Sequence, residues 1–406
     1  MSASRLLEVG VEAVLLATGI VLLVPAVYLL VLALAATVDR MRPVPPRAPM
    51  RAARRVTVVV PAHDEALLIG RCVAALLDQT LARERYAVVV VADNCSDDTE
   101  VLARAAGARV LVRTAPDARG KGHALRFAMD VLLSEIDGPD ALAVVDADTV
   151  ADRGFLAALV AAYESGADAA QGVSLLDPDN EPRSQLRAAA FLLINRVRSG
   201  GRARLGLTCT LQGNGMFFAA DVLRQHPWDA FTSAEDLEYS VRLRLAGERV
   251  EFVPGAILHS PTAPSAQAAD LQSERWEGGK LYVARALVPA LIRSGLRKRP
   301  ALLETALGIL VPPLGLLTGL ASAGAVVAAA LALAGAITWW LLIPYALAVA
   351  AIACFVLLGL WAAAAPRSAY RALAGGPGLV LRKLFRLRRV LGHRAETWIR
   401  TDRQKS

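Results

Sequence analysis

The sequence predicts an α/β domain joined to three apolar helices, and three observations support this fold class. Between residues 56 and 150, short β-branched runs alternate with helical patterns, as in a sheet covered by helices. Residues 13–38 and 305–365 are uncharged and exceed the roughly 20 residues that cross a membrane as a helix. A buried-strand pattern runs directly into Asp146 and Asp148. Ligands of open α/β sheets bind at the carboxyl ends of strands, so the two aspartates mark the expected site.

Composition limits the class of partner. The chain has 406 residues, of which 55% are hydrophobic, yet its formal net charge is +8. The basic residues cluster beside the apolar runs and are not interleaved with aromatic residues, which indicates anionic membrane lipid and argues against nucleic acid. The four cysteines show no metal-binding or redox spacing, so we expect a reducing setting without disulfides. The five histidines show no pairing at helix spacing, which argues against zinc.

The first apolar run is interpreted as an uncleaved membrane anchor within residues 1–40. A secretory signal peptide is the alternative, because residues 33–35 resemble a cleavage site. However, the apolar core at 13–38 is longer than the roughly 7 to 15 residues of a signal peptide. Glu8 and Glu12 also interrupt the basic leader that a signal peptide requires.

The α/β domain is expected to span residues 56–270. Pro61 ends the first strand in this prediction, because proline has no N–H to donate to a ladder. Asp93 follows the second strand, so strand, acidic turn and helix occur twice before Asp146. The predicted elements are strands at 56–60, 87–91 and 108–113 and helices at 66–79, 100–106 and 123–133.

Two further patterns are typical of sites that bind a phosphate or a metal ion. Gly120 and Gly122 flank Lys121 at the predicted start of a helix, where backbone N–H groups, the ammonium and the helix dipole favour a phosphate. Asp146 and Asp148 can reach one hard divalent cation if the chain turns between them. A solvated turn is the alternative interpretation in both cases.

Five short motifs occur in one order within residues 55–279. They are Val58-Val59-Val60-Pro61-Ala62-His63-Asp64-Glu65, Val91-Ala92-Asp93-Asn94, Asp146-Ala147-Asp148, Ala234-Glu235-Asp236 and Gln272-Ser273-Glu274-Arg275-Trp276. In this order, and followed by apolar helices, they resemble the motif set of membrane-bound glycosyltransferase family 2 enzymes. The last motif is similar to the Gln-X-X-Arg-Trp motif of that family's cellulose, chitin and hyaluronan synthases. The resemblance implies a GT-A fold that uses a nucleotide-activated sugar.

The resemblance also implies roles around the nucleotide-sugar donor. Asp148, with Asp146 beside it, would hold Mg²⁺ or Mn²⁺ against the departing diphosphate. Asp93 would hydrogen-bond the uracil, and Arg275 would approach the diphosphate. The residues expected to bind the nucleotide are Pro61, Glu65, Asp93, Lys121, Asp146 and Arg275.

The resemblance also implies an acceptor site, which combines the glycine segment at residues 212–218 with the last motif. Glycines leave room for a sugar ring because they lack side chains. A helix anchored at the bilayer surface by Trp276 and Arg275 is the alternative interpretation of the last motif. The residues expected to bind the acceptor are Gly213, Asn214, Gly215, Gln272 and Trp276.

Asp236, with Glu235 beside it, is the expected catalytic group. In the family it would take the proton of the acceptor hydroxyl as that oxygen attacks the anomeric carbon opposite the diphosphate, which inverts configuration. The alternative is a capping cluster, because acids in a first helical turn suit the helix dipole, and both interpretations can hold at once. A helix N-terminus stabilises the ionised carboxylate, so a base here would need exclusion of water to strengthen it.

The carboxyl-terminal part is expected to return to the membrane. Residues 271–304 would carry the last motif and membrane-interface helices. The 61 residues of 305–365 are too long for one crossing and too short for three, which predicts a hairpin with its turn near 335–340. Pro312 and Pro313 should delay the first helix of this hairpin.

The basic segments predict the orientation. The proline-rich linker at 41–55 and the amphipathic tail at 366–406 are both basic and therefore suit the cytoplasmic leaflet. We expect a multi-pass protein of the plasma membrane, with an outer amino terminus and a cytoplasmic catalytic domain.

Three functions remain open at this stage. The first is transfer of a sugar from a UDP-sugar to a growing poly- or oligosaccharide, and the second is addition of one sugar to a lipid or other membrane acceptor. The third is an inactive nucleotide-binding scaffold, against which the intact Asp148 and Asp236 argue. The Gln-X-X-Arg-Trp motif favours the first function, whereas three spans weaken it because a polymer channel usually needs more helices or subunits.

Overall fold

The computed structural model describes residues 3–41, 48–53, 55–263, 265–297, 299–378 and 380. Within these residues the chain divides into two compact units. One unit comprises the described parts of Met1–Pro43, Asn180–Leu205 and Glu304–Leu391, and the other those of Val44–Asp179 and Gly206–Leu303. The linker residues 42–47 and 54 and the tail beyond residue 380 lie outside the description, so the expectations for them are not tested.

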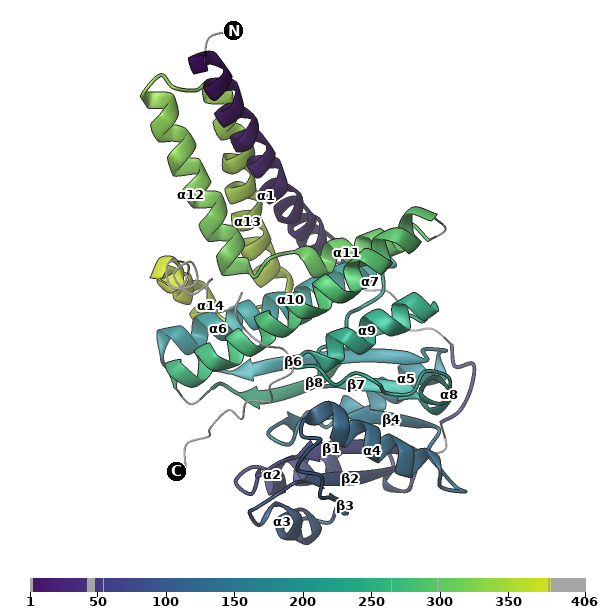
Figure 1. Cartoon of the computed structure of the whole chain (residues 1–406). Coiled ribbons are helices and arrows are strands. Elements are labelled where there is room, and N and C mark those ends of the chain that lie inside the picture. The colour runs from purple at the N-terminus through teal and green to yellow at the C-terminus, as the bar shows by residue number, and fades with distance from the viewer. Residues whose placement is uncertain are drawn as a thin grey trace. The chain divides into compact units, whose positions relative to one another are not determined.

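The second unit is an α/β domain, as predicted, and its described strands form one eight-stranded mixed sheet (Figure 1). The order is β3-β2-β1-β4-β7-β6-β8-β5. The strands β3, β2, β1 and β4 are parallel, β7 is antiparallel to β4 and β6, β6 is parallel to β8, and β5 is antiparallel to β8. The strands are β1 (Val56–Ala62), β2 (Tyr86–Asp93), β3 (Arg109–Arg113), β4 (Ala141–Val144), β5 (Val150–Ala151), β6 (Ala169–Asp177), β7 (Met216–Ala219) and β8 (Val250–Pro261).

Apolar residues of the central strands form the core of this unit. Val58, Val59 and Val60 of β1 are fully buried, as expected of a strand covered on both faces. Phe217 and Phe218 of β7 are buried on the neighbouring part of the sheet. The helices of the unit are α2 (Ile69–Leu77), α3 (Thr99–Ala105), α4 (Lys121–Leu133), α5 (Phe155–Glu164), α8 (Ala220–Gln225), α9 (Glu235–Ala246) and α10 (Ala266–Arg297), with a short turn η1 (Arg83–Arg85).

Strand β1 does not end at Pro61, which corrects the sequence prediction. It continues to Ala62, and Pro61 lies opposite Val91 of β2. Pairing of β1 with β4 stops at Val59, whose carbonyl accepts the N–H of Val145. Pro61 faces the same side two residues later, where no β4 partner follows, so its missing N–H removes no ladder bond.

Two glycines let neighbouring elements approach the loop before α9. A Cβ at Gly122 in α4 would overlap the carbonyl oxygen of Ala230. A Cβ at Gly279 in α10 would lie 2.7 Å from Ser233 Oγ. The rings of His123 and Phe231 stack with centroids 4.4 Å apart. The loop is therefore held from α4 and from α10, immediately before the acidic pair that begins α9.

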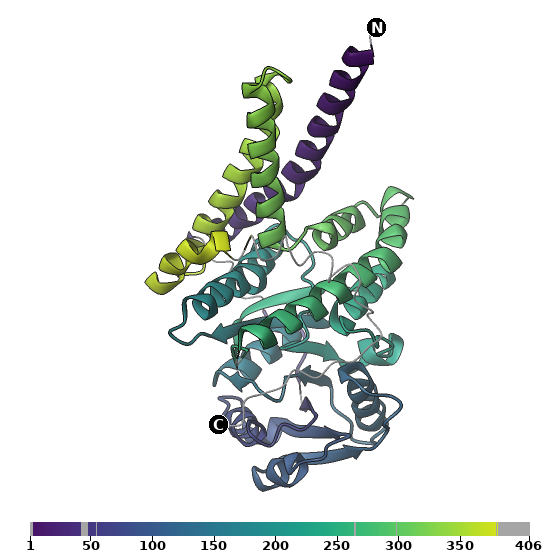
Figure 2. The same ribbon diagram turned by 60° about the vertical axis from the view of Figure 1, so that its left-hand side comes forward.

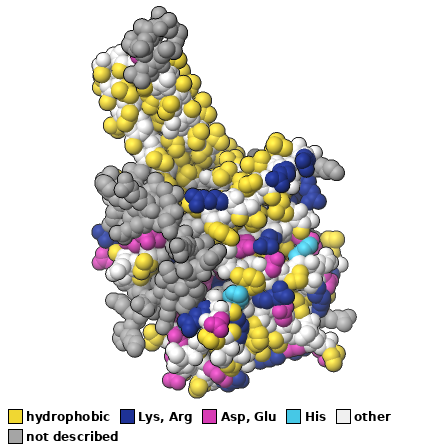
Figure 3. All heavy atoms as spheres, in the orientation of Figure 1, with side chains coloured by type: hydrophobic (Ala, Val, Ile, Leu, Met, Phe, Trp, Pro, Cys, Tyr) yellow, Lys and Arg dark blue, Asp and Glu magenta, His cyan; other side chains and the backbone are white. Residues whose placement is uncertain are grey.

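Three described helices of the first unit are long and apolar enough to cross a membrane: Glu8–Met41, Leu314–Leu333 and Trp339–Ala362. Helices α12 and α13 form the predicted hairpin, and α13 also packs along α1 (Figure 2). Hydrophobic side chains cover the visible face of these helices (Figure 3). The elements are α1 (Ala3–Met41), α6 (Pro182–Leu192), η2 (Leu193–Arg198), α7 (Ser199–Arg204), α11 (Ala301–Leu310), α12 (Leu314–Leu333), η3 (Trp339–Leu342), α13 (Ile343–Ala362), α14 (Arg367–Ala372) and η4 (Leu373–Gly375).

The segment Asn180–Leu205 belongs to the unit of the apolar helices, although it lies between β6 and β7 in the sequence. Arg202 of α7 forms a two-pronged ion pair with Glu304, with both N–O distances 2.9 Å. The same guanidinium donates to Tyr28 Oη of α1, also at 2.9 Å. Gly201 has no Cβ to collide with the backbone of Leu32. The sequence prediction treated 56–270 as one stretch and did not anticipate this insertion.

We expect Gly122→Ala to lower the free energy of unfolding by about 1 to 3 kcal/mol, because the new methyl group must displace the backbone at Ala230. Gly70→Ala is the matched control, since Gly70 is also the second residue of its helix but has no atom within 4 Å of a built Cβ. It should be neutral or stabilising by up to about 1 kcal/mol. Chemical unfolding of the two variants in detergent measures the contrast, and equal stability would contradict the tight α4 contact.

Candidate active site

The site lies where the parallel strands end. Asp93 is the last residue of β2, Asp146 and Asp148 follow β4, and Gly213 and Asn214 precede β7. Because β4 and β7 are antiparallel neighbours, the end of one and the start of the other meet at the same edge. Local folding thus brings the second and third acidic motifs and the glycine segment to one side of the sheet.

Lys121 lies at the centre of a charged cluster. Its ammonium donates to Asp146 Oδ1 and to the Gly213 carbonyl, each at 2.5 Å. Burial alone would lower the pKa of Lys121, but the carboxylates of Asp146, Glu235 and Asp236 outweigh it and raise the pKa. Lys121 is therefore charged over the whole physiological range.

Glu235 and Asp236 begin α9, as the sequence predicted for a helix start. Asp236 Oδ1 accepts the N–H of Leu237 at 2.7 Å. Burial, then repulsion from Glu235, raises the pKa of Asp236 to about 7, and burial also raises the pKa of Glu235. These effects outweigh Lys121, which lowers both pKa values. A carboxyl group with a pKa near neutrality is suited to general base catalysis.

Gly213 lies against this pair. Its φ of +78° is a backbone conformation that favours glycine, and a Cβ there would lie 3.1 Å from Asp236 Oδ2 and 3.5 Å from Lys121 Nζ. Gly215 also has a positive φ, of +74°. The glycine segment is therefore next to the acidic pair, as expected for a segment that leaves space beside a base.

The last sequence motif comes to the same place through α10. Arg275 is one turn before Gly279, whose contact with Ser233 holds α10 against the loop. The positive charge of Arg275 opposes the rise in the pKa of Glu235. Gln272 and Trp276 lie on the same helix, and Trp276 is 38% exposed. The structure thus brings Arg275 to the acidic pair.

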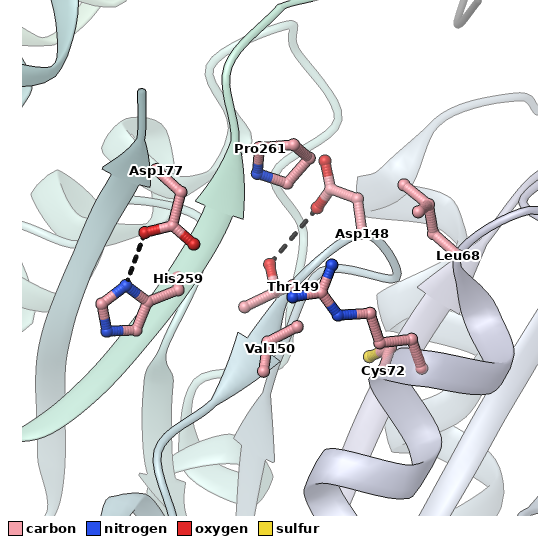
Figure 4. A pocket seen from close by; sticks show the side chains of 9 residues that line it. Leu68, Cys72, Asp148, Thr149, Val150, Asp177, His259 and Pro261 are labelled. Atoms are coloured by element: carbon pink, nitrogen blue, oxygen red, sulfur yellow. Dashed lines mark hydrogen bonds and ion pairs between the residues drawn. The ribbon is translucent and has the colours of Figure 1, made fainter. Parts of the chain in front are cut away.

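Asp148 lines a separate pocket, of about 130 Å³, between α2, the segment after β4, and β8 (Figure 4). His259 Nδ1 is 2.8 Å from Asp177 Oδ1 on the same wall, and Asp148 Oδ1 accepts the Thr149 hydroxyl at 3.2 Å. The pocket is lined by Leu68, Arg71, Cys72, Asp148, Thr149, Val150, Asp177, His259 and Pro261. Asp146 is not among these residues. Both aspartates nevertheless lie near Cys72, since the charge of each raises the pKa of its thiol.

The donor set of the Asp148 pocket fits a divalent cation that also binds phosphate. Mg²⁺ and Mn²⁺ in phosphate-handling sites use one or two carboxylates, with substrate oxygens and water completing the shell. Asp148 supplies a carboxylate to the pocket. His259 also lines it, but its two ring nitrogens face the carboxylates of Asp177 and Asp152, at 2.8 and 3.5 Å, so we do not count it as a ligand. Asp146, the other predicted metal ligand, pairs with the Lys121 ammonium.

Another group of described residues, Asp64, Cys95 and Asp97, has potential ligand atoms within 4.8 Å of one another. Its oxygens are already used: Asp64 Oδ1 accepts the N–H of Ser96 at 2.6 Å, and Asp97 accepts bonds from Thr99 and Ala66. Burial raises the pKa of the Cys95 thiol, which disfavours the thiolate that binds metals. This group is therefore explained by the turn that it stabilises.

The Asn214 side chain is hydrogen-bonded to the turn that follows β4. Its side-chain oxygen accepts the N–H of Asp146 at 3.1 Å, and its amide nitrogen donates to Thr149 Oγ1 at 2.9 Å. The side chain is 5% exposed. These contacts indicate a residue that positions the Asp146 to Asp148 turn, whereas the sequence predicted an acceptor contact.

The predicted nucleobase end is built around Asp93. Arg113 bonds Asp93 Oδ1 at 2.5 Å, and Asn94 donates to the same oxygen at 2.9 Å. Glu65 lies in the adjacent loop, where its N–H donates to Thr99 Oγ1 at 2.7 Å. Pro61 is at the end of β1 beside this loop. The five residues come from three neighbouring strand ends and their loops.

Sequence reasoning missed Arg113 and His259. Each follows an apolar strand pattern, and a polar side chain at a strand's carboxyl end was a usable signal for both. The histidine was set aside because the sequence gave it no partner at helix spacing, whereas its partner Asp177 comes from a different strand.

Comparison with curated proteins identifies relatives that are similar to this chain in sequence. The probable glycosyltransferase YdaM of Bacillus subtilis (strain 168) is 26% identical over 244 residues, which are 58% of this chain and 57% of YdaM. The β-monoglucosyldiacylglycerol synthase of Synechocystis is 26% identical over 239 residues, 55% of this chain and 48% of that protein. The chain thus spans about half the length of these curated relatives.

A solved structure shares the fold. The mannosyltransferase PcManGT from Pyrobaculum calidifontis, in complex with GDP-Man and Mn²⁺, superposes with a TM-score of 0.52 at 21% identity, covering 93% of this chain and 95% of that one. This similarity confirms the expected GT-A-like α/β fold. The cellulose, chitin and hyaluronan synthase subtype stays a prediction.

A family model described as glycosyltransferase-like family 2 matches residues 53–279, which include all five motifs. Since this match covers more than half of the sequence, the chain belongs to glycosyltransferase family 2.

Proposed function

We propose that this protein is an inverting, membrane-bound glycosyltransferase that moves a sugar from a nucleoside diphosphate to a saccharide or membrane acceptor. The observation that carries the proposal is the Asp236 carboxyl group, whose pKa of about 7 suits a general base beside the glycine segment. Asp93 and Asp148 mark the donor side at the ends of β2 and β4. The family membership supports the reaction class.

In this proposal each residue of the site has a separate role. Asp236 takes the proton of the acceptor hydroxyl, while Lys121 and Arg275 stabilise the carboxylates of the acidic pair. Asp93 accepts a hydrogen bond from the nucleobase, and Arg113 fixes that carboxylate. Asp148 is the proposed holder of Mg²⁺ or Mn²⁺, which would neutralise the charge of the leaving diphosphate when bound. The GDP-Man and Mn²⁺ in the mannosyltransferase complex support this assignment by analogy.

Two acceptor classes remain proposals. Gln272, Arg275 and Trp276 support a growing poly- or oligosaccharide through their resemblance to the synthase motif. The name of the Synechocystis relative supports a glycerolipid acceptor instead. Incubating the purified protein with UDP- and GDP-sugars and membrane lipids, then sizing the product, separates them, and release of neither nucleotide would refute the proposed function.

We expect Asp236→Asn to reduce glycosyl transfer by roughly 10² to 10⁴, the typical effect of losing a general base. Asn keeps the size of the side chain and can still accept a bond from Leu237, so stability should change by less than about 1 kcal/mol. Nucleotide affinity, measured by calorimetry, should be retained. Asp221→Asn is the matched control, because Asp221 is an exposed acid in the first turn of α8.

The pH dependence tests the same residue. A base with a pKa of about 7 must lose its proton before it can act, so the wild-type rate should rise about tenfold from about pH 6 to about pH 8. The Asp236→Asn variant should lack this rise. Near-normal turnover of the variant, or an unchanged pH profile, would remove Asp236 from the mechanism.

We expect Asp148→Ala to weaken Mn²⁺ binding at least about tenfold in the presence of UDP, because the proposed carboxylate ligand is lost. Electron paramagnetic resonance of free Mn²⁺ measures this directly, without turnover. Asp64→Ala is the discriminating control, since Asp64 belongs to the alternative group of ligand atoms. Loss of Mn²⁺ from the Asp64 variant with retention by the Asp148 variant would reverse our assignment.

We propose that the catalytic domain lies in the cytoplasm and that the loop between α12 and α13 lies outside the plasma membrane. Arg40, at the end of the first apolar helix, supports this orientation. A membrane-impermeant maleimide should label Ala336→Cys in intact cells but not Ile136→Cys, although both positions are exposed. Permeabilised cells provide the control, in which both should react. Labelling of Ile136→Cys alone in intact cells would overturn the orientation.

A further inference from the structure

The Lys121 ammonium joins two parts of the site that have different proposed tasks. It bonds Asp146, in the turn that leads to Asp148, and the carbonyl of Gly213, in the segment beside Asp236. Lys121 itself begins α4, whose next residue, Gly122, packs against the loop before α9. One side chain is therefore linked to the donor-side turn and to the acceptor-side segment.

The glycine segment is anchored unevenly by its other contacts. The Gly215 N–H donates to Val144 O at 2.9 Å, and the Gly215 carbonyl accepts the N–H of Gly172 at 2.8 Å. Gln171 donates to the Asn214 carbonyl at 2.7 Å. The Gln212 N–H also donates to Gln171 Oε1, at 2.9 Å. These bonds fix residues 212, 214 and 215 to the sheet, whereas the Gly213 carbonyl is bonded by Lys121. Gly213 is also the residue that faces Asp236 Oδ2.

We infer that Lys121 is a positioning residue, which holds Gly213 so that an acceptor bound on this segment meets Asp236. The inference rests on the proposed function and replaces the sequence expectation that Lys121 binds the diphosphate. Two of the three N–H donors of its ammonium are bonded to protein oxygens, one on each side of the site. Lys121 acts through Gly213 and Asp146 and does not touch the reacting atoms.

A positioning role has a distinctive chemical consequence. In transfer, the acceptor oxygen bonds to the anomeric carbon, the bond from that carbon to the diphosphate breaks, and the acceptor proton goes to Asp236. In donor hydrolysis, water takes the place of the acceptor and yields the free sugar and the nucleoside diphosphate. Loss of acceptor positioning should reduce transfer far more than hydrolysis, whereas loss of a diphosphate ligand should reduce both together.

The experiment compares Lys121→Met with Arg119→Met in the full-length protein. Arg119 is an exposed cation two residues earlier, so the control makes the same change of charge in the same loop. Transfer, donor hydrolysis and UDP affinity in Mn²⁺ are measured for each over a pH series. Rates are compared on the alkaline plateau, where Asp236 is ionised, because loss of Lys121 also raises the pKa of Asp236. We expect Lys121→Met to lose roughly 10² in transfer, as for a misplaced reactant, with hydrolysis and UDP affinity within about threefold of the wild type. Lys121→Arg, which keeps the charge and a donor, should recover part of the transfer.

Any other result contradicts either the inference or the proposed function. A loss of UDP affinity in Lys121→Met, with hydrolysis falling as far as transfer, identifies Lys121 as a diphosphate ligand and overturns the inference. Equal activity of the Lys121→Met and Arg119→Met variants overturns it as well. If Lys121→Met does not fold, Lys121→Gln gives the same contrast. A wild-type protein that neither transfers nor hydrolyses any donor would instead refute the proposed function.

Discussion

The arrangement of the candidate site depends on the hydrogen bonds that join the carboxyl end of β4 to the amino end of β7. Val144 accepts the N–H of Gly215, and Asn214 accepts the N–H of Asp146 one step further along. Because the two strands are antiparallel, these bonds fix a chain that leaves the sheet beside a chain that enters it. Asp146 and Asp148 belong to the segment that leaves β4, and Gly213 belongs to the segment that enters β7. A buried amide thus sets the separation of the donor-side and acceptor-side groups.

The balance of charges explains why the pKa of Asp236 is raised. Three carboxyl groups, of Asp146, Glu235 and Asp236, share two nearby cations, Lys121 and Arg275. The acids outnumber the bases, and partial removal from water penalises each further negative charge. The least costly response is for one carboxyl group to keep its proton until neutral pH, which raises the pKa of Asp236. A helix N-terminus favours the ionised form, but here its effect is smaller than that of burial and repulsion.

Local patterns predicted the parallel strands β1 to β4, the helices that follow β1 to β3 and the hairpin of apolar helices, because alternation and run length are properties of neighbouring residues. They did not predict β5 to β8. Local patterns failed where contacts between residues far apart in the sequence determine the structure. Pro61 remains in β1 because β4 has already ended beside it. The ion pair of Asp146 with Lys121 was not predicted, because Lys121 comes from α4, 25 residues earlier in the sequence. Asn214 was expected near the acceptor from the resemblance of its segment to the family, and only the tertiary structure shows its amide bonded to Asp146 and Thr149.

The insertion between β6 and β7 has a consequence for how the protein can be divided. Residues 180–205 carry the buried Arg202, whose partners Tyr28 and Glu304 come from α1 and α11. A fragment cut at the ends of the α/β domain would keep Arg202 and lose Tyr28 and Glu304. It would also expose the apolar side of α6 and η2, which the fragment cannot cover. The catalytic domain is therefore not a detachable module, and a soluble version requires that the insertion be replaced by a short polar connection between β6 and β7.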